Sequence, residues 1–267
     1  MINITRTHTK GSLSPETGEG MQTYTAPKDL LSERVILVTG ASEGIGRTIA
    51  KTYAAHGATV ILLARSIKKL ETLYDEIETA GFPKPAIYPF NLGGATPHDY
   101  QELMQNIDTH FGRLDGLLHN AAILGSLTPI EHYNIEQWYQ VLQVNLNSPF
   151  LLTQATLPLL KKSNDASVIF TSANEGLQGK AYWGAYGVSK FGIEGFMQIL
   201  ADELETNTNI RINSINPVKV RTQLRASAYP AENTKTLTLP QDLIPYYLYL
   251  MGPDAKGVRG KKFTVQV

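Results

Sequence analysis

The sequence contains no cysteine, and its charges are balanced. The lack of cysteine among 267 residues excludes disulfides, thiolate nucleophiles and every metal site that uses a cysteine ligand. Lysine and arginine together number 24, as do aspartate and glutamate, so no field of one sign would attract nucleic acid or an anionic membrane. We therefore expect neither partner, and the missing cysteines fit a cytoplasmic protein.

Long apolar runs are also missing. Runs such as 59–64 are far shorter than the roughly 18 residues of a membrane-spanning helix. Residues 1–20 are rich in Thr, Ser, Gly and charge, and they lack the apolar stretch of a secretory signal. We predict a soluble chain with a disordered tail at 1–24 and a single folded domain at 25–267.

The histidines show no metal-binding pattern. They lack i, i+4 pairs and clustered carboxylates, so surface or packing roles are favoured and no metal is expected. The six are His8, His56, His98, His110, His119 and His132.

From Arg34 onward, short β-branched runs alternate with amphipathic stretches, which is the pattern of βα units on a parallel sheet. The expected strands are 34–39, 58–63, 86–90, 114–119, 167–171, 210–216 and 262–267. The expected helices are 44–56, 67–80, 97–111, 135–161, 185–204 and 241–251. We predict an α/β protein: a single-domain, doubly wound Rossmann fold with a seven-stranded parallel sheet flanked by helices.

Two stretches of the second half have more than one interpretation. Residues 222–239 lack clear periodicity, which is typical of a lid or binding loop. Tyr246, Tyr247 and Tyr249 either line a substrate entrance or pack in a core or interface, and their helical spacing favours packing.

The first strand is followed by a glycine-rich turn that opens the first helix. It reads Thr39-Gly40-Ala41-Ser42-Glu43-Gly44-Ile45-Gly46. Glycines allow a sharp turn and a close backbone approach, and the free N–H groups of a helix start favour a pyrophosphate. Three glycines alone also suit a plain turn, but the position after the first strand predicts a dinucleotide site.

Polar or small residues follow four other predicted strands. They are Asn91-Leu92, Asn120-Ala121-Ala122, Thr171-Ser172 and Asn216-Pro217. Each one alone is explained by helix capping or turn formation. Because ligands of open α/β sheets lie along the carboxyl ends of the strands, the four together predict a binding site there.

Tyr186 and Lys190 lie one helical turn apart on a common helix face. A free phenol titrates near pH 10, so Tyr186 would need a nearby cation, Lys190 or an oxidised nicotinamide ring, to exchange a proton near neutrality. The pair alone also suits a surface helix. Ser172 and Asn145 strengthen the catalytic interpretation. Ser172 stands at the preceding strand end and can bind a substrate oxygen. Asn145 lies inside the long helix expected before that strand.

Together these motifs resemble the short-chain dehydrogenase/reductase family, in family order over about 35–267. They are Thr39 to Gly46, Asn120-Ala121-Ala122, Asn145, Ser172, and Tyr186 with Lys190. Within the family, three further stretches resemble the YciK-like bacterial oxidoreductases. These are Leu118-His119-Asn120-Ala121, Trp183-Gly184-Ala185-Tyr186 and Arg225-Ala226-Ser227-Ala228.

The resemblance implies a role for each matched residue in an NAD(P)-dependent oxidoreductase acting on a small carbonyl or alcohol. Tyr186 would be the acid/base, and Ser172 would orient the substrate oxygen. Lys190 would lower the pKa of Tyr186 and bind the nicotinamide ribose, and Asn145 would hold a water linked to Lys190.

The resemblance also implies which residues touch the cofactor. The expected contacts are Gly40, Ser42, Glu43, Gly44, Ile45, Gly46, Arg65, Asn91, Leu92, Asn120, Ala121, Tyr186, Lys190, Pro217, Val218, Val220 and Thr222. They divide the domain into a cofactor half, 34–122, and a catalytic half, 123–267. The family pairs through the helices expected at 135–161 and 185–204, so a homodimer or homotetramer is expected.

The chain departs from the family pattern at three places. Val218, Ala122 and Asn91 stand where the family usually has Gly, Gly and Asp. Val218 matters most, because its branched side chain limits the backbone and adds bulk near the nicotinamide. We expect a changed pocket or cofactor affinity there.

The end of the second strand favours NADP(H) over NAD(H). Ala64 replaces the acid that would grip a ribose diol, and Arg65 follows it. A guanidinium can bind a 2′-phosphate with two hydrogen bonds, and Ser66, Lys68 and Lys69 add donors nearby. Glu43 counts against this preference, because some family members have a basic residue there.

Two other functions remain compatible with the same fold. A catalytically idle dinucleotide-binding sensor or scaffold would keep the cofactor site, since fold alone does not prove chemistry. A lyase or epimerase would cause no net change in nicotinamide absorbance.

Overall fold

A seven-stranded, all-parallel sheet organises residues 20–266, the part of the chain that the computed structural model describes. The strands are β1 (Val35–Thr39), β2 (Thr59–Ala64), β3 (Ala86–Pro89), β4 (Gly116–His119), β5 (Ser167–Thr171), β6 (Arg211–Asn216) and β7 (Lys261–Thr264). They pair in the order β3-β2-β1-β4-β5-β6-β7, so the winding direction reverses between β1 and β4. The predicted doubly wound fold is confirmed, and the strand ends at this reversal are where such sheets bind ligands.

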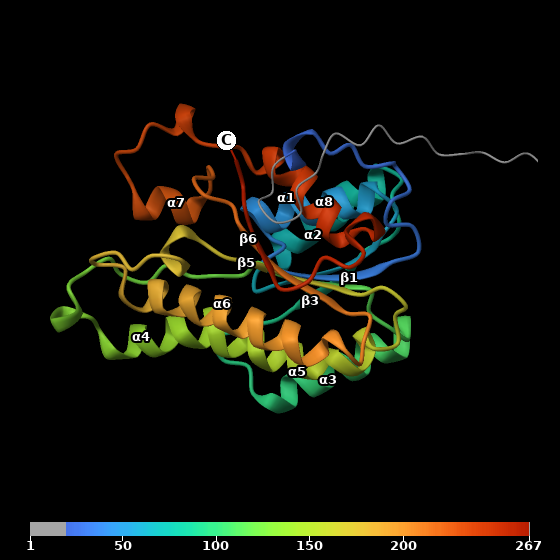
Figure 1. Cartoon of the computed structure of the whole chain (residues 1–267), viewed down its shortest axis with the longest axis horizontal. Coiled ribbons are helices and arrows are strands. Elements are labelled where there is room, and N and C mark those ends of the chain that lie inside the picture. The colour runs from blue at the N-terminus through green and yellow to red at the C-terminus, as the bar shows by residue number, and fades with distance from the viewer. Residues whose placement is uncertain (1–19, 267) are drawn as a thin grey trace, which may run out of the picture.

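Alternating strand side chains build one core on each face of the sheet. Ile36 and Val38 belong to the first core, and Val35 and Leu37 belong to the second. The first is covered by α1 (Gly44–Ala55), α2 (Ile67–Thr79) and α8 (Ile244–Met251). The second is covered by α3 (Pro97–Phe111), α5 (Ser148–Leu160) and α6 (Gly184–Glu205), and Figure 1 shows the two helical layers on opposite sides of the sheet.

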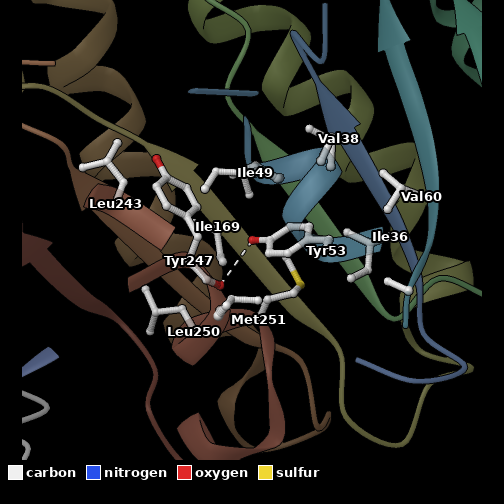
Figure 2. Close-up of a cluster of buried hydrophobic side chains, with 14 of the residues drawn as sticks. Ile36, Val38, Ile49, Tyr53, Val60, Ile169, Leu243, Tyr247, Leu250 and Met251 are labelled. Carbon is white, nitrogen blue, oxygen red and sulfur yellow. Dashed lines mark hydrogen bonds between the residues drawn. The ribbon is translucent and has the colours of Figure 1, made fainter. Parts of the chain in front are cut away.

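The tyrosines of α8 lie in the first core rather than at a substrate entrance. Tyr246, Tyr247 and Tyr249 are all buried, which confirms the packing interpretation. In Figure 2 the Tyr53 hydroxyl of α1 donates to the Tyr247 carbonyl oxygen, at 3.3 Å. The hydrogen bond satisfies a phenol that is otherwise surrounded by aliphatic side chains.

The helix predicted at 135–161 is confirmed as one continuous helical stretch, Ile135 to Leu160, but it is not α-helical throughout. The structure has α4 (Ile135–Leu142), a π-helical turn (Gln143–Asn147) and then α5. Pro149 supplies a physical reason, because it has no N–H to donate to the Asn145 carbonyl four residues earlier. Asn145 therefore lies in a local widening of the helix, a feature that is frequent at functional sites.

The folded part of the chain begins earlier than predicted. Residues 1–19 of the predicted tail lie outside the described residues, but Met21–Thr23 form a 3-10 helix in which Met21 is buried. The next residue, Tyr24, packs edge-on against Tyr249 of α8, at 5.4 Å between ring centroids. Residues 21–24, predicted to lie in the tail, are therefore packed against the folded domain.

The stretch 222–239, expected to be irregular, contains a short helix, α7 (Gln223–Ala228). Thr222 caps it, since the Thr222 hydroxyl accepts a hydrogen bond from the Arg225 N–H at 3.2 Å. In Figure 1 α7 stands apart from both helical layers. Between residues 20 and 266 no helix is long and apolar enough to cross a bilayer.

Candidate active site

The glycine-rich turn after β1 is closed by contacts that only glycine allows. Gly40 has φ +66°, and a Cβ there would come within 2.9 Å of the Ala121 Cα. A Cβ at Gly46 would collide with the Gly40 carbonyl oxygen. The turn thus packs directly on the segment after β4, and its backbone lines a cavity.

Thr39 joins the ends of β1 and β4. Its hydroxyl accepts hydrogen bonds from the N–H groups of Asn120, at 3.0 Å, and Ala121, at 3.1 Å. The same hydroxyl donates to the Leu118 carbonyl oxygen, at 3.2 Å. Thr39, the first residue of the motif that contains the glycine turn, thus ties that turn to the segment after β4.

One cavity of about 700 Å³ runs along the carboxyl ends of the strands. Almost all predicted site residues line it. They are Gly40, Ser42, Glu43, Gly44, Ile45, Arg65, Asn91, Leu92, Asn120, Ala121, Ser172, Tyr186, Lys190, Pro217, Val218, Val220 and Thr222. Gly46 and Asn145 lie behind the lining, where they act through packing and hydrogen bonds. Residues more than 180 positions apart in sequence thus share one space.

The cofactor end of the cavity carries a mixed set of charges. Arg65 is exposed and lines the cavity beside Ser66. Lys69 Nζ lies 2.6 Å from a carboxylate oxygen of Glu43, so the charge of this glutamate is compensated within the site. Lys68, expected to add a donor, is not among the lining residues.

The catalytic end holds a buried cation beside a buried phenol. Lys190 Nζ donates to the Thr171 carbonyl oxygen at 2.8 Å and lies 5.6 Å from the centre of the Tyr186 ring. Ser172 follows Thr171, and its buried hydroxyl has no hydrogen-bond partner in residues 20–266. A buried hydroxyl without a partner is costly, so this one is suited to receive a ligand atom.

The protein raises the pKa of Tyr186 instead of lowering it. Burial is the main cause, the charge of Glu175 adds to it, and the charge of Arg225 opposes it. In the protein without a cofactor, burial therefore outweighs any lowering of the Tyr186 pKa by a neighbouring cation. Burial also lowers the pKa of Lys190 to about 8, against the opposing charges of Glu194 and Glu175.

The geometry can be compared with that of known proteins. The family model described as short chain dehydrogenase matches residues 34–233. The chain belongs to the short chain dehydrogenase family. It is an oxidoreductase of the kind that acts on an alcohol or carbonyl carbon with a nicotinamide dinucleotide.

Individual relatives support the same assignment and the predicted YciK-like subgroup. The uncharacterized oxidoreductase YciK of Escherichia coli K12 is 48% identical over 243 residues, which are 91% of this chain and 96% of that protein. The cyclohexanol dehydrogenase of Acinetobacter sp. strain SE19 is 30% identical over 88% of this chain and 94% of its own.

Solved structures of this family superpose closely on the chain. A short chain dehydrogenase from Salmonella enterica serovar Typhi gives a TM-score of 0.89 at 47% identity, over 91% of this chain and all of that one. A structure from Escherichia coli CFT073 complexed with NADPH gives a TM-score of 0.87 at 48% identity, with the same coverage.

In this member of the family, the Asn145 amide fixes the segment after β4. Its oxygen accepts from the Ile123 N–H, and its nitrogen donates to the Ile123 carbonyl oxygen, both at 2.9 Å. The nitrogen also donates to Ser189 Oγ at 3.1 Å. Both amide N–H groups are used, so only the Asn145 oxygen could bind the water that we expected it to hold.

An aromatic and apolar cluster surrounds Tyr186 at this end of the cavity. Trp183 and Ala228 are buried with Tyr186, and Tyr229 and Leu224 pack against them. Glu175 also lines the cavity. The resemblance to the YciK-like proteins drew attention to Trp183, but no spacing rule marks Glu175 or Tyr229.

Val218 adopts a backbone conformation that suits glycine. Its φ is +61°, in the left-handed region, and its N–H donates to the Asn216 side-chain oxygen at 3.1 Å. A β-branched residue in this region is strained by about 1–2 kcal/mol. The expected restriction of the backbone at Val218 therefore takes the form of local strain beside the cavity.

Replacing Val218 by glycine should increase the free energy of unfolding. Relief of about 1–2 kcal/mol of strain is partly offset by the greater freedom of an unfolded glycine, which leaves a gain of roughly 0.5–1 kcal/mol. Urea unfolding of Val218→Gly measures it, with Val218→Ala as a control that keeps the Cβ and should gain less. A glycine variant less stable than the alanine variant would contradict the strain.

Proposed function

We propose that this protein transfers a hydride between NADP(H) and a small carbonyl or alcohol substrate, with Tyr186 as the proton donor and acceptor. The observation that carries the proposal is the unpartnered Ser172 hydroxyl, which lines the same cavity as Tyr186 and Lys190. A carbonyl oxygen between Ser172 and Tyr186 would receive two hydrogen bonds. The bound nicotinamide supplies the hydride.

Ser172, Tyr186 and Lys190 then have distinct tasks. Ser172 orients and polarises the substrate oxygen. Tyr186 gives its proton to that oxygen as negative charge develops on it. Lys190, held by the Thr171 carbonyl, places a positive charge beside the phenol and retains N–H groups for the nicotinamide ribose.

The raised pKa of Tyr186 favours carbonyl reduction near neutral pH. A phenol that stays protonated is ready to donate. Oxidation of an alcohol needs the phenolate instead, and the positive charge of an oxidised nicotinamide would then have to offset burial.

Replacing Tyr186 by phenylalanine should leave NADPH affinity within about twofold and reduce turnover by about 10²–10⁴-fold, because only the transferable proton is lost. NADPH oxidation with a panel of aldehydes, ketones and quinones measures turnover, and fluorescence titration measures binding. Tyr182→Phe, an exposed tyrosine, is the control. A Tyr186→Phe rate above half the wild-type rate would overturn the assignment. A wild type that binds NADPH but reduces nothing would be an idle binding protein.

The cofactor half, 34–122, supports NADP(H) as the preferred form. The glycine turn has no room for side chains at Gly40 and Gly46, which suits a pyrophosphate bound by backbone N–H groups. Arg65 lines the cavity, and Ala64 stands where an acidic side chain would repel a 2′-phosphate. Glu43 is compensated by Lys69, so its charge opposes a 2′-phosphate less than the sequence suggested. The NADPH complex of the homologue at 48% identity agrees with this preference.

The preference should invert when Ala64, the last residue of β2, and Arg65, which follows it, are both replaced. One charge-assisted contact favours NADP(H) by roughly tenfold to a hundredfold. Titrating both cofactors into the wild type and into Ala64→Asp/Arg65→Leu measures the ratio of dissociation constants. Lys68→Leu, outside the cavity, is the control for loss of a cation. Equal wild-type affinities for NAD(H) and NADP(H) would show that Arg65 has no such role.

We further propose that two copies of the chain pair through α4, α5 and α6. These helices carry exposed apolar side chains at Tyr139, Phe150, Val188, Phe191 and Ile199. Apolar surface repeated along neighbouring helices is typical of an interface between identical subunits.

Light scattering at micromolar concentration should give the mass of a dimer or tetramer. Phe191→Asp should shift it toward the monomer, since it would bury a charge in the interface. Ile67→Asp, an equally exposed apolar residue on α2, should leave the mass unchanged. A monomeric wild type would refute the interface.

A further inference from the structure

A carboxylate that the proposed mechanism does not use faces the catalytic end of the cavity. Glu175 belongs to the 3-10 helix Asn174–Gly176, which follows β5 and Ser172. It is partly buried and lines the cavity together with Tyr186, Lys190 and Trp183. Its carboxylate makes no hydrogen bond or ion pair within residues 20–266.

The short helix that carries Glu175 is held firmly on both sides. The Asn174 side-chain oxygen accepts a hydrogen bond from the Asn216 amide, at 2.7 Å, which ties the helix to the end of β6. Gly176 packs against α6, since a Cβ there would come within 2.9 Å of the Lys190 carbonyl group. The segment that carries Glu175 is therefore packed directly against the backbone of Lys190.

Two cations near Glu175, Lys190 and Arg225, are held by other groups. Lys190 donates to the Thr171 carbonyl oxygen. Arg225 binds both carboxylate oxygens of Glu232, at 2.6 and 2.7 Å, and its guanidinium lies 3.8 Å from the centre of the Tyr229 ring. The negative charge of Glu175 is still felt by Tyr186 and Lys190, so it acts on the space where the substrate would lie.

Apolar and aromatic side chains form much of the surrounding wall. Trp183 packs against the rings of Tyr186, at 5.5 Å, and Tyr229, at 5.8 Å between centroids. Leu124 and Leu224 pack against the same cluster. A single acceptor of hydrogen bonds on an apolar wall discriminates strongly between ligands that do and do not satisfy it.

We propose that Glu175 determines substrate specificity by accepting a hydrogen bond from a hydroxyl or ammonium group next to the substrate carbonyl, and by repelling a carboxylate there. The inference rests on the proposed reductase function and narrows its substrates to carbonyl compounds with a neighbouring donor. A hydrogen bond to a charged acceptor corresponds to a preference of about tenfold to a hundredfold.

Four phenyl ketones of similar size test the proposal. 2-Hydroxyacetophenone and 2-aminoacetophenone carry a hydroxyl and an ammonium donor, propiophenone carries a methyl group, and phenylglyoxylate carries a carboxylate. The wild type should favour both donor ketones over propiophenone by tenfold or more in kcat/KM, and phenylglyoxylate should be worst. The ratio of kcat/KM for the two donor ketones shows whether Glu175 prefers a hydroxyl or an ammonium group.

Glu175→Gln should abolish the preference for the ammonium ketone and increase the rate with phenylglyoxylate, while the melting temperature stays unchanged. Glu102→Gln on α3 removes the same charge outside the cavity. It should alter neither the preference for the ammonium ketone nor the rate with phenylglyoxylate. A Glu175→Gln variant with wild-type ratios among the four ketones would overturn the proposal.

Calorimetric titration of the NADPH-loaded wild type with the same ketones separates this proposal from the proposed function. Selective binding of the donor ketones without reduction would mean that the hydride-transfer proposal fails while the role of Glu175 stands. Equal binding of all four ketones, or binding of none, would mean that Glu175 does not select the substrate.

Discussion

The hydrogen bond from Lys190 Nζ to the Thr171 carbonyl oxygen holds the catalytic end together. It joins α6 to the end of β5 across the buried side of the cavity. Tyr186 lies one turn before Lys190 on α6, and Ser172 follows Thr171, so the bond sets the spacing between phenol and hydroxyl. Gly176 allows the chain after Ser172 to pack directly on Lys190. A bulkier residue there would separate the two elements that the site needs in contact.

Burial acts on the two titrating groups in opposite directions. It raises the pKa of Tyr186 and lowers that of Lys190 to about 8, because both charged forms lose water. Without a bound cofactor, the protein therefore favours a neutral Tyr186 phenol. The neighbouring Lys190 ammonium group loses its proton more readily than that of a free lysine. The charge of Glu175 raises the pKa of both Tyr186 and Lys190. The residue that we propose to select the substrate therefore also affects proton transfer.

The two ends of the cavity use charge differently. At the cofactor end, Lys69 compensates Glu43 and leaves Arg65 exposed, so the net character is positive. At the catalytic end, Glu232 pairs with Arg225, and Glu175 places a carboxylate without an ion-pair partner in the described part of the chain near the buried Lys190. A dinucleotide phosphate and a donor-bearing carbonyl compound would each meet the charge that suits it.

The sequence by itself determined the parallel sheet, the glycine turn and most of the cavity lining. These follow from local rules: β-branched runs form strands, glycine permits tight turns, and parallel strands end at one edge. Pro149 also carried a local signal for the π-helical turn, which the periodicity of 135–161 concealed.

Only the tertiary structure decided the charge state of Tyr186, the pairing of Glu43 with Lys69 and the free carboxylate of Glu175. Each depends on burial or on groups from separate elements, such as Arg225 and Glu232 beyond β6. Sequence spacing describes neighbours within one helix or strand. It contains no measure of the solvent excluded when distant elements pack, and that exclusion sets these energies.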